Sequence, residues 1–131
     1  MTKSLLADLD AGGFPEKTPG LEVEFRADPS TWDGRFANNG WLQELPRPIT
    51  RLTWDNAALI SPQIATRLAL ENGDRVRLRH GGREVTAPVW IVPGQAAESV
   101  TLHFGGGRQR AGKVGSKIGY DAYALRGAAA P

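Results

Sequence analysis

The chain has 131 residues, of which 40% are hydrophobic and 23% are charged, and its formal net charge is +2. This length fits one domain with a single core, and the composition is typical of a globular protein rather than a disordered one. The chain has no cysteine, which excludes a cysteine-ligated iron–sulfur cluster, a thiolate zinc site and a cysteine nucleophile. The small net charge gives no argument for nucleic acid as a partner.

The two ends of the chain have few regular apolar patterns. Residues 1–20 contain several glycines and prolines, so we expect a loosely ordered lead-in with one short helix around Leu5 to Leu9. The first residues do not form a secretory signal, and no stretch reaches the ~20 apolar residues that cross a bilayer. Residues 127–131 are expected to be a tail. We therefore predict that residues 21–126 are a soluble domain of a longer protein, without direct membrane insertion.

The first half of this domain predicts one strand and a long irregular segment. Residues 21–26 alternate apolar and polar side chains, which indicates a half-buried strand. Residues 31–51 follow neither the helical nor the strand period, but they contain Trp32 and Trp41. Such a segment is too apolar to be a free loop, so we expect it to lie across the body of the domain. Residues 52–60 resume a buried, partly extended pattern.

A short helix is predicted next. Ser61 is suited to the N-cap and Pro62 to the first helical position. Ile64 and Leu68 would share one face of this helix, and the Asn-Gly pair at residues 72–73 is expected to end it.

The second half predicts a hairpin and a further strand. Alternating residues from 75 to 91, with a turn at residues 80–82, indicate two antiparallel strands, and residues 100–104 indicate a third. Several short strands with one helix predict a mainly β barrel or sandwich. The absence of strand–helix–strand alternation argues against a doubly wound dinucleotide fold.

Few residues suggest catalysis. His80, beside the predicted turn, is interpreted as a solvated residue and His103 as a structural strand residue, since neither has cysteine or carboxylate neighbours at ligand spacing. His103 is the better functional candidate because it precedes a glycine run. No Gly-x-Ser-x-Gly motif supports a nucleophilic serine.

A cationic glycine-rich stretch at residues 105–119 is the most suggestive feature. Between Ser99 and Tyr120 the chain carries four cations and no acid. Glycines let backbone N–H groups approach an anion, and cations such as Arg108 supply countercharge. The stretch is neither a Walker loop nor a dinucleotide fingerprint, so two interpretations stay open, a diphosphate site and a solvated loop.

The four tryptophans also allow two interpretations. They anchor the irregular segment over the barrel by burying apolar area, or they dock on a neighbouring domain or subunit. We favour anchoring, with some faces exposed where a larger protein would cover them.

Two runs resemble the molybdopterin oxidoreductase-like subunit of the alternative complex III family, residues 32–46 (WDGRFANNGWLQELP) and residues 52–58 (LTWDNAA). That subunit is the large iron–sulfur subunit of a quinol-oxidising membrane complex. The runs at residues 87–90 (APVW) and 119–126 (GYDAYALR) are similar to it too, so the resemblance covers roughly residues 25–126.

More distantly, the order of elements resembles the molybdopterin dinucleotide-binding domain of the dimethyl sulfoxide reductase superfamily. The resemblance implies a six-stranded double-psi β-barrel with one or two short helices. It also implies that three loops would hold a molybdopterin guanine dinucleotide. The corresponding residues are Asn38, Asn39, Gly40, Gly105, Gly106, Arg108 and Asp121.

Two departures from the superfamily pattern argue against a bound cofactor. Trp41 and Leu42 stand where polar groups are usual, and Asp121 places a carboxylate where an amide would meet guanine or phosphate. We therefore expect no cofactor in this chain, or molybdopterin guanine dinucleotide if the ancestral site survives.

The resemblance implies a structural domain without its own catalysis, in an electron-transfer oxidoreductase subunit on the periplasmic face of a membrane. Its expected partners are the remaining domains of the parent chain and other subunits of the complex, not nucleic acid. Two alternatives stay open. One is a working cofactor-binding module, and the other is a β-barrel adaptor that binds protein or extended peptide.

Overall fold

A computed structural model describes residues 3–6 and 20–126 of the chain. Five strands and three short α-helices lie within residues 20–126, and one further short strand lies at residues 3–6. The strands are β1 (Lys3–Leu6), β2 (Glu22–Arg26), β3 (Ala58–Ile60), β4 (Arg75–His80), β5 (Arg83–Ile91) and β6 (Ser99–His103). The helices are α1 (Gly40–Glu44), α2 (Pro62–Leu68), α3 (Gly112–Gly115) and the 3₁₀ helix η1 (Ala122–Ala124).

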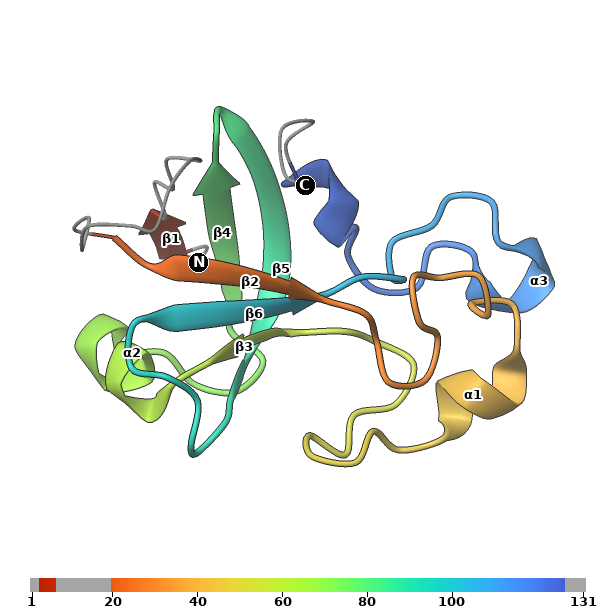
Figure 1. Ribbon diagram of the computed structural model, residues 1–131, viewed down its shortest axis with the longest axis horizontal. Helices are drawn as coiled ribbons and strands as arrows, with labels where there is room; N and C mark the ends of the chain where they lie inside the picture. Colours follow the sequence, from red (N-terminus) through yellow and green to blue (C-terminus); the bar gives the residue numbers. More distant parts are fainter. Residues whose placement is uncertain (1–2, 7–19, 127–131) are drawn as a thin grey trace.

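The strands form one mixed sheet, hydrogen-bonded in the order β1-β4-β5-β3-β6-β2 (Figure 1). Three pairs are parallel, namely β1 with β4, β3 with β5, and β2 with β6. The β4–β5 hairpin and the β3–β6 pair are antiparallel. The mainly β prediction is therefore confirmed. The edge strands β1 and β2 do not pair with each other within the described residues, so the sheet described here is open.

The predicted helix forms with the predicted start. The Ser61 hydroxyl accepts the Ile64 N–H at 3.1 Å, and Pro62 is the first helical residue. The predicted end is wrong, because the helix stops at Leu68 and Ala69 adopts a left-handed conformation with φ of 49°.

The Asn-Gly pair expected to stop this helix is instead hydrogen-bonded to strand β5. The Asn72 side chain accepts the Ile91 N–H at 2.7 Å, and the Gly73 N–H donates to the Val89 carbonyl at 2.9 Å. The pair therefore binds the start of β4 to the far end of β5.

The hairpin prediction is confirmed. Between β4 and β5 lie only Gly81 and Gly82, both with positive φ, as the favoured two-residue hairpin turn requires. His80 is the last residue of β4 rather than part of the turn.

The core lies between the sheet, α2 and the C-terminal segment. β6 is buried on both of its faces, since the residues from Ser99 to Leu102 are all buried, which fits its place between β3 and β2. The largest fully buried apolar side chains are Ile60, Ile64, Leu78, Leu102, Leu125, Val76, Val89 and Val100.

The parallel ladder between β3 and β5 is short for a chemical reason. It begins with Ala58 opposite Val89, and the preceding residue of β5 is Pro88. Proline has no N–H to donate to the chain before Ala58, so the ladder cannot continue in that direction. The chain before β3 then diverges from β5, and β5 N-terminal to Pro88 has a strand partner on one side only within the described sheet.

The helix expected around Leu5 to Leu9 is not formed at its start. Lys3–Leu6 is strand β1, parallel to β4. Residues 7–19 of the predicted lead-in and the predicted tail at residues 127–131 lie outside the described residues.

We expect Leu102→Ala to lower the free energy of unfolding by about 3 kcal/mol, because it leaves a cavity in a fully buried position. Leu45→Ala is the matched control, since Leu45 is exposed and the same substitution there should change stability by less than about 0.5 kcal/mol. Urea denaturation of both variants measures the difference, and equal losses would contradict the assigned core.

Candidate functional site

The irregular segment after β2 is fixed by a buried ion pair. Arg47 Nε lies 2.7 Å from Asp28 Oδ2, with the two side chains 7% and 1% exposed. Arg47 Nη1 also donates to the Leu52 carbonyl at 3.2 Å. The other Asp28 oxygen accepts the N–H groups of Ser30 and Thr31 at 2.8 and 2.9 Å. These contacts join the start of the segment to its end. Whether the segment lies across the body of the domain stays a prediction.

The electrostatics of this pair favour the charged carboxylate. Burial alone would raise the pKa of Asp28, but the Thr31 N–H, the Arg47 guanidinium and the Ser30 N–H together hold it below its usual value. The ion pair therefore exists at neutral pH.

The glycine-rich stretch is an ordered loop closed at its base. The Gly107 N–H donates to the Ile118 carbonyl at 2.6 Å, and the Lys117 N–H donates to the Arg108 carbonyl at 2.7 Å. Helix α3 lies at the tip of the loop. The loop is therefore closed at its base, while all four of its cations, Arg108, Arg110, Lys113 and Lys117, are exposed, as in the interpretation of a solvated loop.

Asn56 joins this loop to the sheet. Its Nδ2 donates to the carbonyls of Tyr120 and His103 at 3.1 and 3.2 Å, and its Oδ1 accepts the Tyr120 N–H at 2.9 Å. A Cβ added at Gly106 or Gly119 would overlap the Asn56 amide, so both glycines are needed for this close approach. The side chain therefore binds both ends of the loop at once.

The Asn-Asn-Gly turn and the glycine-rich loop lie side by side, as expected. Asn38 Oδ1 accepts the Val114 N–H of α3 at 3.0 Å, and α1 and α3 are neighbours at one end of the molecule (Figure 1). Arg108 Nη2 donates to the Asp33 carbonyl at 2.7 Å. A Cβ at Gly112 would overlap Asn38, so the two loops are in direct contact.

The same contacts occupy several of the groups assigned to a ligand. Asn38 Oδ1 is bonded to α3, and Asn39 Oδ1 caps α1 by accepting the Leu42 N–H at 3.4 Å. Gly105 packs against Thr31, and Arg108 is bonded to the neighbouring loop. Gly40, the first residue of α1, would place a Cβ against Val114. The Asn-Asn-Gly turn and the glycine-rich loop thus bind each other through residues that were assigned to a ligand.

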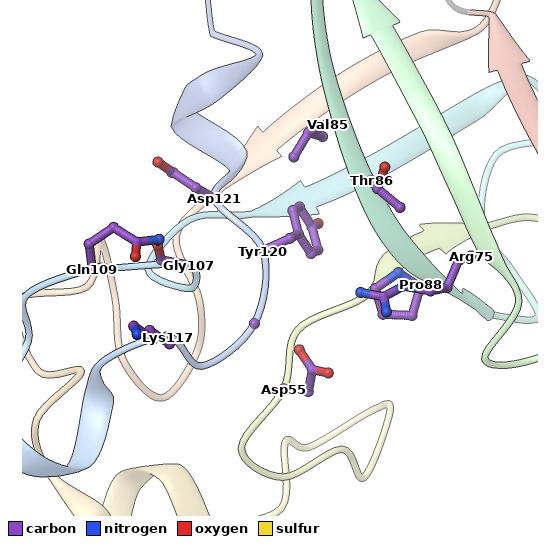
Figure 2. Close-up of a pocket in the computed structure, with 11 residues that line it drawn as sticks. Asp55, Arg75, Val85, Thr86, Pro88, Gly107, Gln109, Lys117, Tyr120 and Asp121 are labelled. Carbon is purple, nitrogen blue, oxygen red and sulfur yellow. The ribbon is translucent and has the colours of Figure 1, made fainter. Parts of the chain in front are cut away.

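A cleft lies on the other side of the glycine-rich loop. It has a volume of about 570 Å³ and separates β5 from the stretch that ends in Tyr120 (Figure 2). Of the predicted site residues only Asp121 lines it. Gly106 and Gly105 do not, whereas Gly107 does.

The charges around this cleft are balanced. Arg75 and Lys117 line it together with Asp55 and Asp121. Asp121 Oδ1 accepts the Tyr123 N–H at 2.9 Å and so caps η1. Two cations beside two carboxylates do not favour a diphosphate, and the cleft lacks the positive charge that the predicted anion site needs.

The anchoring interpretation, which allowed some exposed faces, is wrong for Trp41. Trp32 is 54% exposed and Trp41 is 84% exposed, whereas Trp54 and Trp90 are half-buried. The inner face of α1 is occupied by Gln43, whose amide donates to the Ala37 carbonyl at 2.9 Å, so Trp41 lies on the outer face. The other exposed large apolar side chains are Phe36, Leu45, Ile49 and Tyr123. All but Tyr123 belong to residues 32–49.

Burial determines the electrostatics of His103. Burial lowers the pKa of His103 below its usual value, although nearby Asp28 opposes the shift. Within residues 20–126 and the short strand β1, no group of three or more histidine and acidic side chains is placed to hold a metal ion.

No helix in the same part of the chain is long and apolar enough to cross a membrane.

Sequence reasoning missed Asp28, Arg47 and Asn56. For Asn56 a signal existed, since it is a lone amide directly before the apolar run at residues 57–60. A polar residue in that position must find buried partners. The Asp28–Arg47 pair spans 19 residues of irregular chain and left no periodic signal.

Comparison with known proteins gives no assignment. No protein-family model matches the chain, and no curated protein matches it.

We expect Asn56→Ala to lower the free energy of unfolding by about 3 kcal/mol, because it leaves the buried N–H and C=O of Tyr120 without partners. Asn39→Ala is the control, since it removes only an exposed helix cap and should cost at most about 1 kcal/mol. Thermal and urea unfolding measure both values. Equal effects would show that Asn56 does not hold the loop.

The Asp28–Arg47 pair predicts a specific dependence on pH. The folded-state pKa of Asp28 lies below its usual value of 3.8, so the stabilising effect of the carboxylate is complete above about pH 4 and is lost as the pH falls through the folded-state pKa. At pH 7, Asp28→Asn should cost about 3–5 kcal/mol, because Arg47 is left buried and unpaired. The cost should shrink toward pH 2.

Glu98→Gln is the control for this measurement. It breaks the exposed pair with Arg67 and should change the free energy of unfolding by less than about 1 kcal/mol at either pH. A cost of Asp28→Asn that is the same at pH 7 and pH 2 would contradict the proposed role of the carboxylate.

Proposed function

We propose that this chain is a molybdopterin dinucleotide-binding-like barrel domain of an electron-transfer oxidoreductase subunit, and that it acts there as a structural domain without catalysis of its own. The single observation that carries the proposal is the mutual binding of the Asn-Asn-Gly turn and the glycine-rich loop. The resemblance assigns both loops to a dinucleotide, and in this chain each binds the other instead.

The strand order supports the barrel part of this proposal. Three parallel pairs combined with one hairpin require crossing connections, which is the kind of topology that a double-psi barrel has. Closure would need a contact between β1 and β2, the two edges of the described sheet.

The molybdopterin guanine dinucleotide that the resemblance implies does not fit these residues. Asn38 and Asn39 already accept backbone N–H groups, and the carboxylate of Asp121 would repel a phosphate. The nearby cleft is lined by two acids as well as two cations. We therefore derive no chemistry through this cofactor.

The exposed aromatic side chains support a role in assembly. Trp32, Phe36 and Trp41 lie on a segment that the buried ion pair holds in place, so they form a preorganised surface rather than a loose chain. Tryptophan is a common anchor where proteins meet, and apolar side chains of this size are usually covered. In the proposed assembly, the remaining domains of the parent chain cover them. The proposal places that parent on the periplasmic face of a membrane.

Titration with GMP and GDP tests the proposal. We expect no saturable heat in calorimetry and no saturable change in tryptophan fluorescence up to about 1 mM nucleotide, because the amide oxygens of Asn38 and Asn39 already accept backbone N–H groups. Saturable binding that Asn39→Ala weakens would instead favour a working cofactor-binding module. Binding of extended peptides without nucleotide binding would favour an adaptor.

A further inference from the structure

A second, smaller cavity lies on the ion-pair side of the sheet. Its volume is about 190 Å³, and it lies between β6, the end of β5 and the segment that follows Arg47. Most of its surface is apolar, contributed by Pro29, Pro48, Ile49, Leu59 and Val92. A mostly apolar cavity with a few converging polar groups is the usual form of a small-molecule site.

Two polar side chains at this cavity keep unused hydrogen-bonding groups. Arg47, only 7% exposed, uses Nε for Asp28 and Nη1 for the Leu52 carbonyl, which leaves Nη2 without a partner among the described residues. The imidazole of His103 makes no hydrogen bond to any described residue either. Both side chains line the cavity.

Most acceptors next to this cavity are already occupied. The exception is Oε1 of Gln95, whose amide uses only Nε2, on the Ser99 and Thr101 hydroxyls. Both Asp28 oxygens accept hydrogen bonds, from Arg47 on one side and from two backbone N–H groups on the other. The Glu24 oxygens bind Arg26 and the Thr101 hydroxyl. The unused capacity therefore consists mainly of donors, which an acceptor-only group such as an ionised carboxylate would satisfy.

We infer that this cavity binds a small apolar carboxylate, with its carboxylate oxygens on Arg47 Nη2 and the His103 imidazole and its body against Leu59 and Val92. The size sets the class of ligand. An apolar protein cavity of about 150 Å³ is enough for benzene, so this one suits a single ring or a short acyl chain. Arg26 also lines the cavity. Only its Nε is bound to Glu24, so its other guanidinium nitrogens are further donors.

The inference is independent of the proposed function, because it uses neither the glycine-rich loop nor the nucleotide groups. Calorimetry with benzoate, benzamide and benzylammonium separates the effect of ligand charge on affinity from the effect of ligand shape. All three compounds share one ring, and their polar groups are negative, neutral and positive. We expect benzoate to bind with a Kd on the order of 1 mM or tighter, benzamide at least about tenfold more weakly, and benzylammonium not at all.

Variants locate the binding. Val92→Trp should abolish benzoate binding by filling the cavity, and His103→Leu should weaken it about fivefold, with partial recovery in His103→Gln, which restores an N–H donor. Arg75→Gln is the matched control, because Arg75 lines the larger cleft instead and benzoate affinity should not change. Unfolding curves of each variant verify that the fold is kept, and Ile49→Trp supplies a second way to block the cavity if Val92→Trp does not fold.

Three results would overturn the inference. They are no benzoate binding up to about 10 mM, equal affinities for benzoate and benzamide, and benzoate binding that survives in folded variants with a blocked cavity. Nucleotide titrations have no bearing on these outcomes, so this inference and the proposed function can fail separately.

Discussion

The amide of Asn56 is the contact on which the arrangement of this molecule depends. One buried side chain binds the end of β6 at His103 and both backbone groups of Tyr120, and thereby closes a loop of more than a dozen residues. A buried amide of this kind tolerates no slippage, because any shift leaves polar groups without partners. The glycines beside it, Gly106 and Gly119, have no side chain because the amide occupies that space.

The fixed loop then determines what the turn at Asn38 can do. Helix α3 presents the Val114 N–H to Asn38, and Arg108 reaches the Asp33 carbonyl, so the two loops form one layer at the end of the sheet. The ion pair of Asp28 and Arg47 holds the other side of this layer. The two loops are thus joined by hydrogen bonds from side chains on both, and Trp41 faces outward from the end of the molecule that they form.

The sequence predicts the regular parts of the fold well. The Ser61 cap, the Gly81–Gly82 hairpin and the alternating strands follow from local chemistry, and each forms where it is expected. The wrong predictions of secondary structure occur where a contact with a residue far along the chain determines the local conformation. Residues 72–73 have the composition of a helix end but bind β5, and Lys3–Leu6 follows β4 into the sheet rather than forming a helix.

The sequence indicates which two loops lie together, but it does not indicate which groups their side chains bind. Residues near Asn38 and Gly105 indicate two loops that belong together, and the structure brings them into contact. Whether they leave room for a ligand depends on side-chain contacts across more than seventy residues of chain, such as that of Asn38 with Val114. No local pattern encodes such a contact. The exposure of Trp41 also depends on tertiary structure, because Gln43 takes the inner face of α1.

The interruption of the sheet at Pro88 bears on how this protein behaves at high concentration. From Arg83 to Pro88, strand β5 has a second side with no strand partner in the described sheet, and such an edge can recruit strands from other molecules into aggregates. Pro88 removes one of the donors that an incoming strand would need, and η1 packs against the same strand. The proline at which the β3–β5 ladder ends therefore also makes the open edge less suited to non-native association.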